Sequence, residues 1–478
     1  MTRTERQTRE AASPRADTGG DPAGFDAMAE RFDALEKTYL RRRHLLDGPK
    51  ETGLAFVRDT AATLRREAPD AGEFVAEAVA RKGELARITL NAAALVALED
   101  GLWVVARTLA AEVTARDHHD LTSQRIIDAA GERARDLVTE TDRWLATRSC
   151  NAPFRQIETR ANLSVHFCCS AWQPLPIGRI DDAASGFWRS DTAAEIRRSV
   201  TEGDFTHCSR WHCPAIADRR LPPKANAPET VPAAPKRVIL SHDRSCNISC
   251  PSCRQKLILL DHKASARLDE MFATTLSPYL RDAEDIKVTG SGDPFGSRHF
   301  RTVLKTLTAE PVPRRRIQIH TNGLLANERA WTDLNLWENV SSVWVSVDGA
   351  TAESYAELRR GGDFAQLCEN LRFLGTLNRA GAIDSLRLDF VVQARNFEEM
   401  GDFVDLARSV DASGVYFLRL RNWGHFSADA FREMDVCDPA HPRHDDLRRM
   451  LADDRLAGAD VDLGTLAVLY RAAAGLPG

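Results

Sequence analysis

Short apolar runs alternate with amphipathic stretches through the second half of the chain, and this alternation constrains the fold most strongly. Six such runs are Arg237–Leu240, Ile286–Thr289, Ile317–His320, Val343–Val347, Leu386–Val392 and Val415–Leu420. Segments with helical periodicity separate them, for instance Thr302–Leu307, Ala352–Leu358 and Phe397–Val410. Repeated strand–helix units predict an α/β fold with a parallel sheet and helices packed outside it. Six units are fewer than a closed eight-stranded barrel requires.

Three cysteines come directly after the first of these runs. Cys246, Cys250 and Cys253 are spaced C-x3-C-x2-C within Arg244–Arg254. Thiolates bind zinc and iron strongly, but a closed structural zinc site takes four ligands, and no fourth Cys or His follows at zinc-ribbon spacing. Three ligands leave one metal position open. A structural metal loop or three free thiols is the alternative interpretation of this stretch.

The three-cysteine loop and the alternating pattern together resemble the radical SAM superfamily. In that family the loop after the first barrel strand holds a [4Fe–4S] cluster, and S-adenosylmethionine (SAM) binds the free iron. The resemblance implies a partial (β/α)6 barrel over residues 237–425. It also implies cleavage of SAM to a 5′-deoxyadenosyl radical that abstracts hydrogen from a substrate carbon, with Cys246, Cys250 and Cys253 as the catalytic cysteines. A reductase such as flavodoxin or ferredoxin would supply the electron.

The same resemblance assigns SAM-binding positions to the ends of successive strands. Thr289–Pro294 resembles the Gly-Gly-Glu-Pro element of the family, with Asp in place of Glu. The implied contacts are Gly290, Gly292, Asp293 and Pro294 after the second strand, Ser346 and Asp348 after the fourth, Arg360 in a covering loop, Gln393 after the fifth, and Leu418 and Arg419 on the sixth. A capped glycine-rich turn and a surface charge are the alternatives for the first group and for Arg360. Trp423 is placed at the substrate mouth or as a packing residue of a lid.

A second group of cysteines precedes the barrel, within residues 148–214. Four or five cysteines in so short a segment favour a second metal site, for which a four-cysteine zinc module is the alternative. The order of landmarks resembles the SPASM type of auxiliary cluster module, which usually follows the barrel. The resemblance implies a second [4Fe–4S] cluster bound by Cys150, Cys168, Cys208 and Cys213, with Cys169 as the alternative to Cys168. The family glycine before the cysteine pair is replaced by Leu163, and the Asn of its Gly-Asn turn by Arg179.

The remaining segments carry no catalytic motif. We expect a disordered tail over residues 1–24, a helical bundle over 25–147, a Pro/Ala linker over 215–236 and a helical extension over 426–478. Phe25, Met28, Phe32, Leu35 and Tyr39 form the apolar stripe of the first bundle helix. The bundle is a candidate docking surface for a substrate, a partner or a second copy of the chain.

Charge and hydropathy exclude several classes of partner. The net charge of −5 gives no basic footprint for nucleic acid or for an anionic membrane. No apolar run approaches the roughly 20 residues that span a bilayer, and the N-terminus lacks a signal-peptide core, so we expect a cytoplasmic protein. The leading hypothesis is a radical SAM enzyme acting on a small sugar- or nucleoside-like intermediate. The alternatives are modification of a ribosomal peptide, by epimerisation or crosslinking, and a non-catalytic metal-binding assembly protein.

Overall fold

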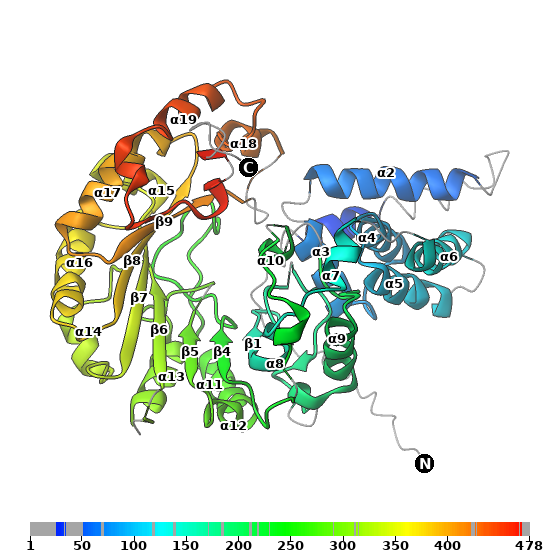
Figure 1. Ribbon diagram of the computed structural model, residues 1–478, viewed down its shortest axis with the longest axis horizontal. Helices are drawn as coiled ribbons and strands as arrows, with labels where there is room; N and C mark the ends of the chain where they lie inside the picture. Colours follow the sequence, from blue (N-terminus) through cyan, green and yellow to red (C-terminus); the bar gives the residue numbers. More distant parts are fainter. Residues whose placement is uncertain are drawn as a thin grey trace, which may run out of the picture.

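The computed structural model shows a helical N-terminal part beside a long curved sheet (Figure 1). The residues it describes run from 25 to 470, with gaps at 33, 35–50, 68–70, 117–119, 137–139, 171, 183–185, 210–212, 218, 229, 290, 310–311, 314, 422–425, 427 and 468. The predicted disordered tail and the positions Gly290 and Trp423 lie outside these residues. Within them, no helix is both long enough and apolar enough to cross a membrane.

The N-terminal part is a bundle of helices around its own core. Its helices are α2 (Glu51–Glu67), α3 (Ala71–Ala80), α4 (Arg87–Glu99), α5 (Trp103–Arg116), α6 (Leu121–Asp136) and α7 (Glu140–Leu145). Every residue of α4 from Ile88 to Leu98 is buried, so this helix forms the centre of the bundle rather than one of its faces. The others pack around it through side chains such as Leu64, Val75 and Leu109.

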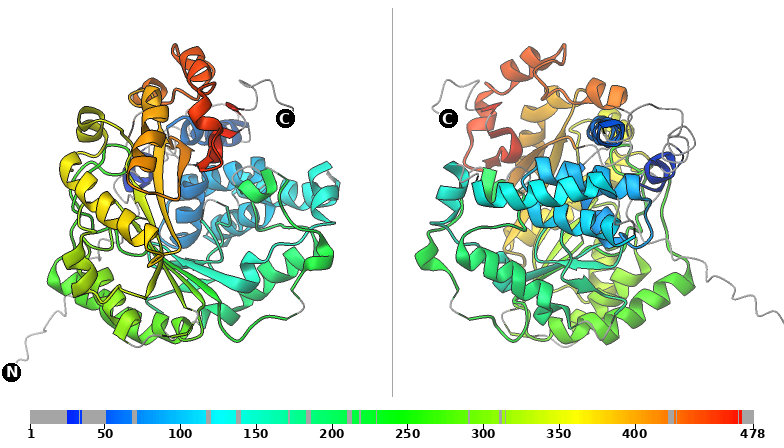
Figure 2. Two further views of the ribbon diagram at one scale, coloured as in Figure 1. Left: turned by 60° about the vertical axis from the view of Figure 1, so that its left-hand side comes forward. Right: turned by 90° about the vertical axis from the view of Figure 1, so that its right-hand side faces the viewer.

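The second half of the chain forms the predicted parallel sheet. Its strands are β4 (Arg237–Leu240), β5 (Asp285–Val288), β6 (Arg316–Thr321), β7 (Val340–Ser346), β8 (Ser385–Val392) and β9 (Gly414–Arg419). They pair in sequence order, all parallel. Figure 2 shows helices along the outside of the curved sheet. The helices between the strands are α11 (His262–Met271), α12 (Ser277–Leu280), α13 (Arg298–Ala309), α14 (Glu328–Asp333), α15 (Ala352–Leu358), α16 (Phe364–Arg379) and α17 (Met400–Ser409).

Only one face of this sheet is apolar, which differs from the continuous apolar strands that the sequence pattern suggested. Alternate residues such as Val288, Ile319, Val345 and Leu388 are fully buried within the core. The residues between them are half-buried, and many are polar. Side chains alternate across a strand, so the apolar set faces the outer helices and the polar set lines the concave face. The concave face is therefore a polar surface rather than a filled barrel core.

The cysteine-rich segment before the barrel extends the same sheet. It contains α8 (Ala152–Arg155), β1 (Gln156–Thr159), β2 (Ser164–His166), β3 (Gly178–Arg179), α9 (Asp191–Glu202) and α10 (Pro214–Ala217). β1 pairs in parallel with β4, from Gln156 opposite Arg237 to Thr159 opposite Leu240. β2 and β3 follow as antiparallel neighbours, which makes a ten-stranded sheet with β10 at the other end. The segment thus covers the backbone edge that β4 would otherwise expose.

The bundle contacts this segment as well. Asn162 donates a hydrogen bond to Glu77 on α3, with 2.6 Å between Nδ2 and Oε2. Leu175 packs against both the bundle core and the barrel core. The right-hand view of Figure 2 shows the bundle helices stacked over the segment that follows them. The cysteine-rich segment therefore joins the bundle to the barrel.

Leu163 occupies the tight turn between β1 and β2, where the resemblance placed a glycine. Its φ is +66°, in the left-handed region that glycine adopts without steric cost. For a non-glycine residue, that backbone conformation costs about 1 kcal/mol of free energy. The Leu163 side chain is only 3% exposed, and burial of a leucine contributes about 1.5–3 kcal/mol. Burial offsets the backbone cost, so the turn keeps its shape without the glycine.

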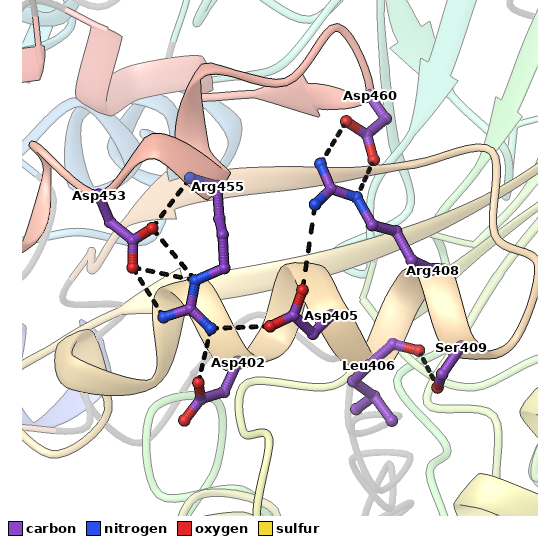
Figure 3. Close-up of polar contacts among 8 residues, drawn as sticks. All are labelled: Asp402, Asp405, Leu406, Arg408, Ser409, Asp453, Arg455 and Asp460. Atoms are coloured by element: carbon purple, nitrogen blue, oxygen red, sulfur yellow. Dashed lines mark hydrogen bonds and ion pairs between the residues drawn. The ribbon is translucent and has the colours of Figure 1, made fainter.

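The C-terminal residues close the opposite edge of the sheet. They form α18 (Ala428–Met434), α19 (His444–Met450) and β10 (Val461–Asp462), which pairs in parallel with β9. Figure 3 shows how this segment is attached to α17: Arg455 bonds to Asp402, Asp405 and Asp453, and Arg408 bonds to Asp460. Exposed ion pairs contribute little singly, but this network joins three short segments. The predicted helical extension therefore also adds a strand.

Candidate radical SAM site

The three-cysteine loop lies at the carboxyl end of β4, where parallel α/β folds place their active sites. Cys246 and Cys250 are 7% and 5% exposed, and Cys253 is half-buried. All three are free thiols. Burial raises the pKa of Cys246 to about 11, with the nearby Asp293 adding to the rise. Burial also raises the pKa of Cys250. Thiols in such surroundings become thiolates when a cation or metal compensates their charge.

Each thiol of the loop accepts a hydrogen bond from a different nitrogen donor. The donors are Asn322 Nδ2 for Cys246 at 3.6 Å, Arg359 Nη1 for Cys250 at 3.7 Å and Arg254 Nη2 for Cys253 at 3.3 Å. They come from separate loops, so the fold brings positive charge and N–H groups to three sulfur atoms of one segment. Donors of this kind around metal-bound thiolates orient the ligands and stabilise their charge.

Arg359 is a residue that the sequence did not single out. Its Nη2 lies 2.7 Å from Asp348 Oδ2, and the two side chains are 12% and 3% exposed. Asp348 has a φ of +62°, and its other oxygen accepts a hydrogen bond from the backbone of Val391 at 2.8 Å. Arg360, the predicted SAM contact in this loop, bonds to Ser249 and to the carbonyl of Gln255. Nothing in the sequence distinguishes two adjacent arginines in one loop.

The loop after β5 holds Asp293 in full burial. Its carboxylate accepts four hydrogen bonds, from the backbone of Phe295 at 3.0 Å and Gly296 at 3.1 Å, from Thr321 Oγ1 at 2.7 Å and from the backbone of Asn322 at 2.8 Å. These bonds fill the main acceptor positions of the carboxylate. A Cβ on Gly292 would lie 2.5 Å from the Asp243 carbonyl oxygen, so a side chain is excluded there. Pro294 is buried beside them. The loop thus connects β5, β6 and the cysteine loop.

The other predicted SAM contacts are spread over the remaining strand ends. Ser346 Oγ lies 3.0 Å from His320 Nε2. Arg419 donates a hydrogen bond to Asp435, with 2.6 Å between Nη2 and Oδ2. Leu418, the residue before it, is half-buried. Gln393 is 1% exposed, and its Nε2 has no hydrogen-bond partner within the described part of the chain.

Gln393 lines a cavity between the cysteine loop and the end of β8. The volume of this cavity is about 140 Å³. Its lining comprises Pro251, Ser252, Glu357, Leu358, Gln393, Arg395, Phe426 and Met434. A buried amide without a partner costs free energy, and a ligand acceptor in the cavity would remove that cost. The cavity therefore fits a ligand group that presents a hydrogen-bond acceptor next to the cysteine loop.

The second cysteine group also converges in space. Burial raises the pKa of Cys168 well above its usual value, and the neighbouring thiols of Cys208, Cys150 and Cys213 add to the rise. Burial likewise raises the pKa of Cys150 to about 11, again with a contribution from Cys213. Four cysteines far apart in sequence thus act on one another electrostatically. Among the described residues, however, no three His, Cys, Asp or Glu side chains are close enough to bind one single metal ion.

Arg197 on α9 holds the segments that carry these cysteines. Its guanidinium lies between the rings of Phe167 and Trp188, 4.7 and 4.3 Å from their centroids. It donates hydrogen bonds of 2.8 Å to the carbonyls of Pro153 and Trp188. Pro153 follows Cys150, and Phe167 precedes Cys168. One buried cation therefore sets the distance between two of the cysteine-bearing segments.

Known proteins resemble this chain over part of its length. No protein-family model matches the chain. A probable GTP 3′,8-cyclase of Saccharolobus islandicus is 25% identical over 218 residues, 45% of this chain and 62% of that protein. The mycofactocin maturase MftC of Mycobacterium ulcerans is 28% identical over 202 residues, 41% of this chain and 49% of that protein. The peptide-bound structure of Streptococcus suis SuiB overlaps 39% of this chain and 40% of its own, at 11% identity and a TM-score of 0.30.

The chain thus matches about half to three-fifths of the length of these two curated relatives. Both are radical SAM enzymes. The sequence similarity of this chain to these two enzymes is consistent with its three-cysteine loop at the end of β4 and with its partial parallel barrel. By these sequence matches, the chain is similar to radical SAM enzymes over part of its length.

Proposed function

We propose that this protein is a radical SAM enzyme that removes a hydrogen atom from a carbon of its substrate. One observation carries the proposal: three buried or half-buried thiols, each with its own N–H donor, lie on a loop that also lines a cavity with an unpartnered amide. Bound to these thiols, a [4Fe–4S] cluster supplies the electron that cleaves SAM to a 5′-deoxyadenosyl radical. A flavodoxin or ferredoxin is the proposed source of that electron.

The chain's own residues contribute binding and positioning. Cys246, Cys250 and Cys253 hold the cluster, and Arg359 and Arg254 offset the charge of the thiolates. The Nε2 of Gln393 donates to an acceptor nitrogen of the adenine, because it is the buried donor in the cavity that lacks a protein partner. Burial of the loop keeps water away from the sulfur atoms, so every charge interaction there is stronger.

Substitution of Gln393 tests the SAM site. In Gln393→Leu we expect SAM to bind about tenfold more weakly, since loss of one hydrogen bond in a buried site costs about 1–1.5 kcal/mol. The iron content should stay unchanged. The measurements are equilibrium binding of SAM and formation of 5′-deoxyadenosine with dithionite, on anaerobically reconstituted protein. Gln366→Leu, on the exposed surface of α16, is the matched control. Equal affinity in both variants would place SAM elsewhere.

We also propose a second [4Fe–4S] cluster bound by Cys150, Cys168, Cys208 and Cys213. Their mutual effect on thiol pKa supports one shared site. A zinc ion would draw four sulfur atoms to about 2.3 Å from one point, whereas the thiolates of a cluster bind separate irons.

Single substitutions at the cysteine pair test this ligand set. The thiols of Cys208, Cys150 and Cys213 all act on Cys168, as does the adjacent Cys169, and β2 ends at His166, so Cys168 and Cys169 need not follow strand alternation. We expect Cys168→Ala to lose the auxiliary cluster and Cys169→Ala to retain it. Iron analysis and electron paramagnetic resonance are measured in a background that lacks Cys246, Cys250 and Cys253. The opposite pattern would assign the ligand to Cys169.

For the substrate we propose a small nucleoside- or sugar-like molecule. One of the relatives is named for its action on GTP, a nucleotide. Modification of a ribosomal peptide is the second candidate, because the other relative is a maturase. In that case the bundle would dock the peptide. Incubation of reduced enzyme with nucleosides, sugars and peptides deuterated at carbon, followed by a search for deuterium transfer into 5′-deoxyadenosine, separates the two.

A further inference from the structure

The concave face of the sheet carries a layer of charged and aromatic side chains. Trp344 on β7 lies at its centre. The Lys287 Nζ of β5 is 4.1 Å from the centroid of the Trp344 ring, and the Arg387 Cζ of β8 is 3.4 Å from it. Arg387 also lies 4.5 Å from the ring centroid of Tyr416 on β9. Three strands thus bring two cations to one aromatic ring.

The two cations differ in their counter-ions. Arg387 forms two hydrogen bonds with Asp389, at 2.7 and 2.9 Å. Glu158 on β1, another carboxylate of this face, is paired with Arg160 at 3.1 Å. Lys287 forms no ion pair with any carboxylate in the part of the chain that the structure describes; its one direct contact with a charged or aromatic group is the Trp344 ring.

Lys287 is therefore the cation of the layer that has no direct ion pair among the described residues. Burial lowers the pKa of its ammonium to about 8, although two carboxylates act in the opposite direction. The charged groups that act on it are Asp389, Glu158, Arg387 and Arg237. A desolvated ammonium without a counter-ion costs free energy. An anion of a ligand in the concavity would remove that cost.

The layer is close to the proposed radical site. His320 on β6 lies 3.0 Å from Ser346 Oγ and 3.5 Å from Asp389 Oδ2. Burial lowers the pKa of His320 well below its usual value, and the charge of Arg359, which contacts Cys250, contributes to that shift. A molecule bound in this layer would thus lie next to the strand end that the cysteine loop faces.

We infer that Lys287 is a specificity-determining residue that binds a carboxylate or phosphate group of the substrate. The inference rests on the proposed function, because it assigns the recognition group of the same site. It narrows the substrate to an anionic molecule. The Trp344 ring holds the ammonium in place, and the pairing of Arg387 with Asp389 leaves Lys287 as the cation that meets the ligand.

Trace acetylation of lysines tests this role on the full-length, reconstituted protein. Isotopic acetic anhydride reacts with neutral amines, so labelling from pH 6 to 10 and mass spectrometry of the peptides give a midpoint for each lysine. We expect the Lys287 midpoint to rise by one pH unit or more with inorganic phosphate or with acetate. Lys305, an exposed lysine of α13, should not shift and is the internal control.

The two anions identify the source of the charge. A response to phosphate alone indicates a phosphorylated substrate, and a response to acetate a carboxylate. Calorimetric binding of the responding anion should weaken at least tenfold in Lys287→Met and stay unchanged in Lys305→Met. No response to either anion, or an equal shift at Lys305, overturns the subsite. SAM cleavage is measured on the same preparation, so loss of cleavage with an intact anion response contradicts the proposed function alone.

Discussion

Replacement of Cys246, Cys250 and Cys253 together by alanine is expected to abolish SAM cleavage completely. The three thiols are the proposed metal ligands of the barrel site, and no other described residue offers a thiol there. The cysteine-rich segment is separate, so about half of the iron should remain if each site holds one four-iron cluster. Iron and sulfide analysis and the yield of 5′-deoxyadenosine measure the two effects.

Cys368→Ala is the control for the triple variant. Cys368 lies on α16, is half-buried and has its pKa raised by burial, so it matches the buried thiols without being near the loop. This variant should keep all of its iron and all of its cleavage activity. Unchanged iron in the triple variant, or zinc in place of iron in the wild type, would contradict the two-cluster proposal.

Arg359→Met should produce the largest loss of stability among single substitutions near the site. The change leaves the carboxylate of Asp348 buried and without its cation, 3% exposed. Removal of one partner from a buried ion pair costs about 3–5 kcal/mol. Cys250 also loses its N–H donor, so cluster assembly should be impaired. The midpoint of urea unfolding, followed by circular dichroism, reports the stability, and iron content reports the assembly.

Arg360→Met, one residue further along, is the matched control. Its side chain is exposed and bonds to Ser249 and Gln255. Exposed contacts of this type contribute at most about 1 kcal/mol. The two variants should therefore differ by several-fold in their effect on the unfolding free energy. Similar changes in the unfolding free energy of the two variants would show that the burial of Arg359 does not determine its contribution to stability.

Much of the fold follows from the sequence because hydrophobic periodicity is local. The six predicted strands each overlap one strand of the parallel sheet, as for Val343–Val347 and β7. The pairing of β1 with β4 was not predicted, since about 80 residues separate them and β1 has only four. Strand β10 has only two residues, which is too short for hydrophobic periodicity to predict it. Both depend on edges that exist only after the sheet has formed.

The candidate site divides in a similar way. The spacing of Cys246, Cys250 and Cys253 identifies the metal loop because all three ligands lie in one short segment. Arg254 is adjacent to Cys253 in the sequence, but the donors Asn322 and Arg359 reach the sulfur atoms only through folding, so no spacing marks them. Lys287 is an ordinary strand lysine in the sequence. Its proposed role in binding an anion is indicated by its contact with the ring of Trp344, which lies two strands away in the sheet.

The parallel pairing of β1 with β4 has a consequence for biosynthesis. Ribosomes make the chain from its N-terminus, so the cysteine-rich segment emerges well before the strand that completes its edge. Until residues 237–240 leave the exit tunnel, β1 presents an unpaired row of backbone donors and acceptors. An iron–sulfur cluster inserted into the cysteine-rich segment during that interval would be inserted while β1 is still unpaired. A nascent chain arrested near residue 230 should therefore be more prone to aggregate than one arrested far enough beyond β5 for both β4 and β5 to have left the tunnel and joined the sheet.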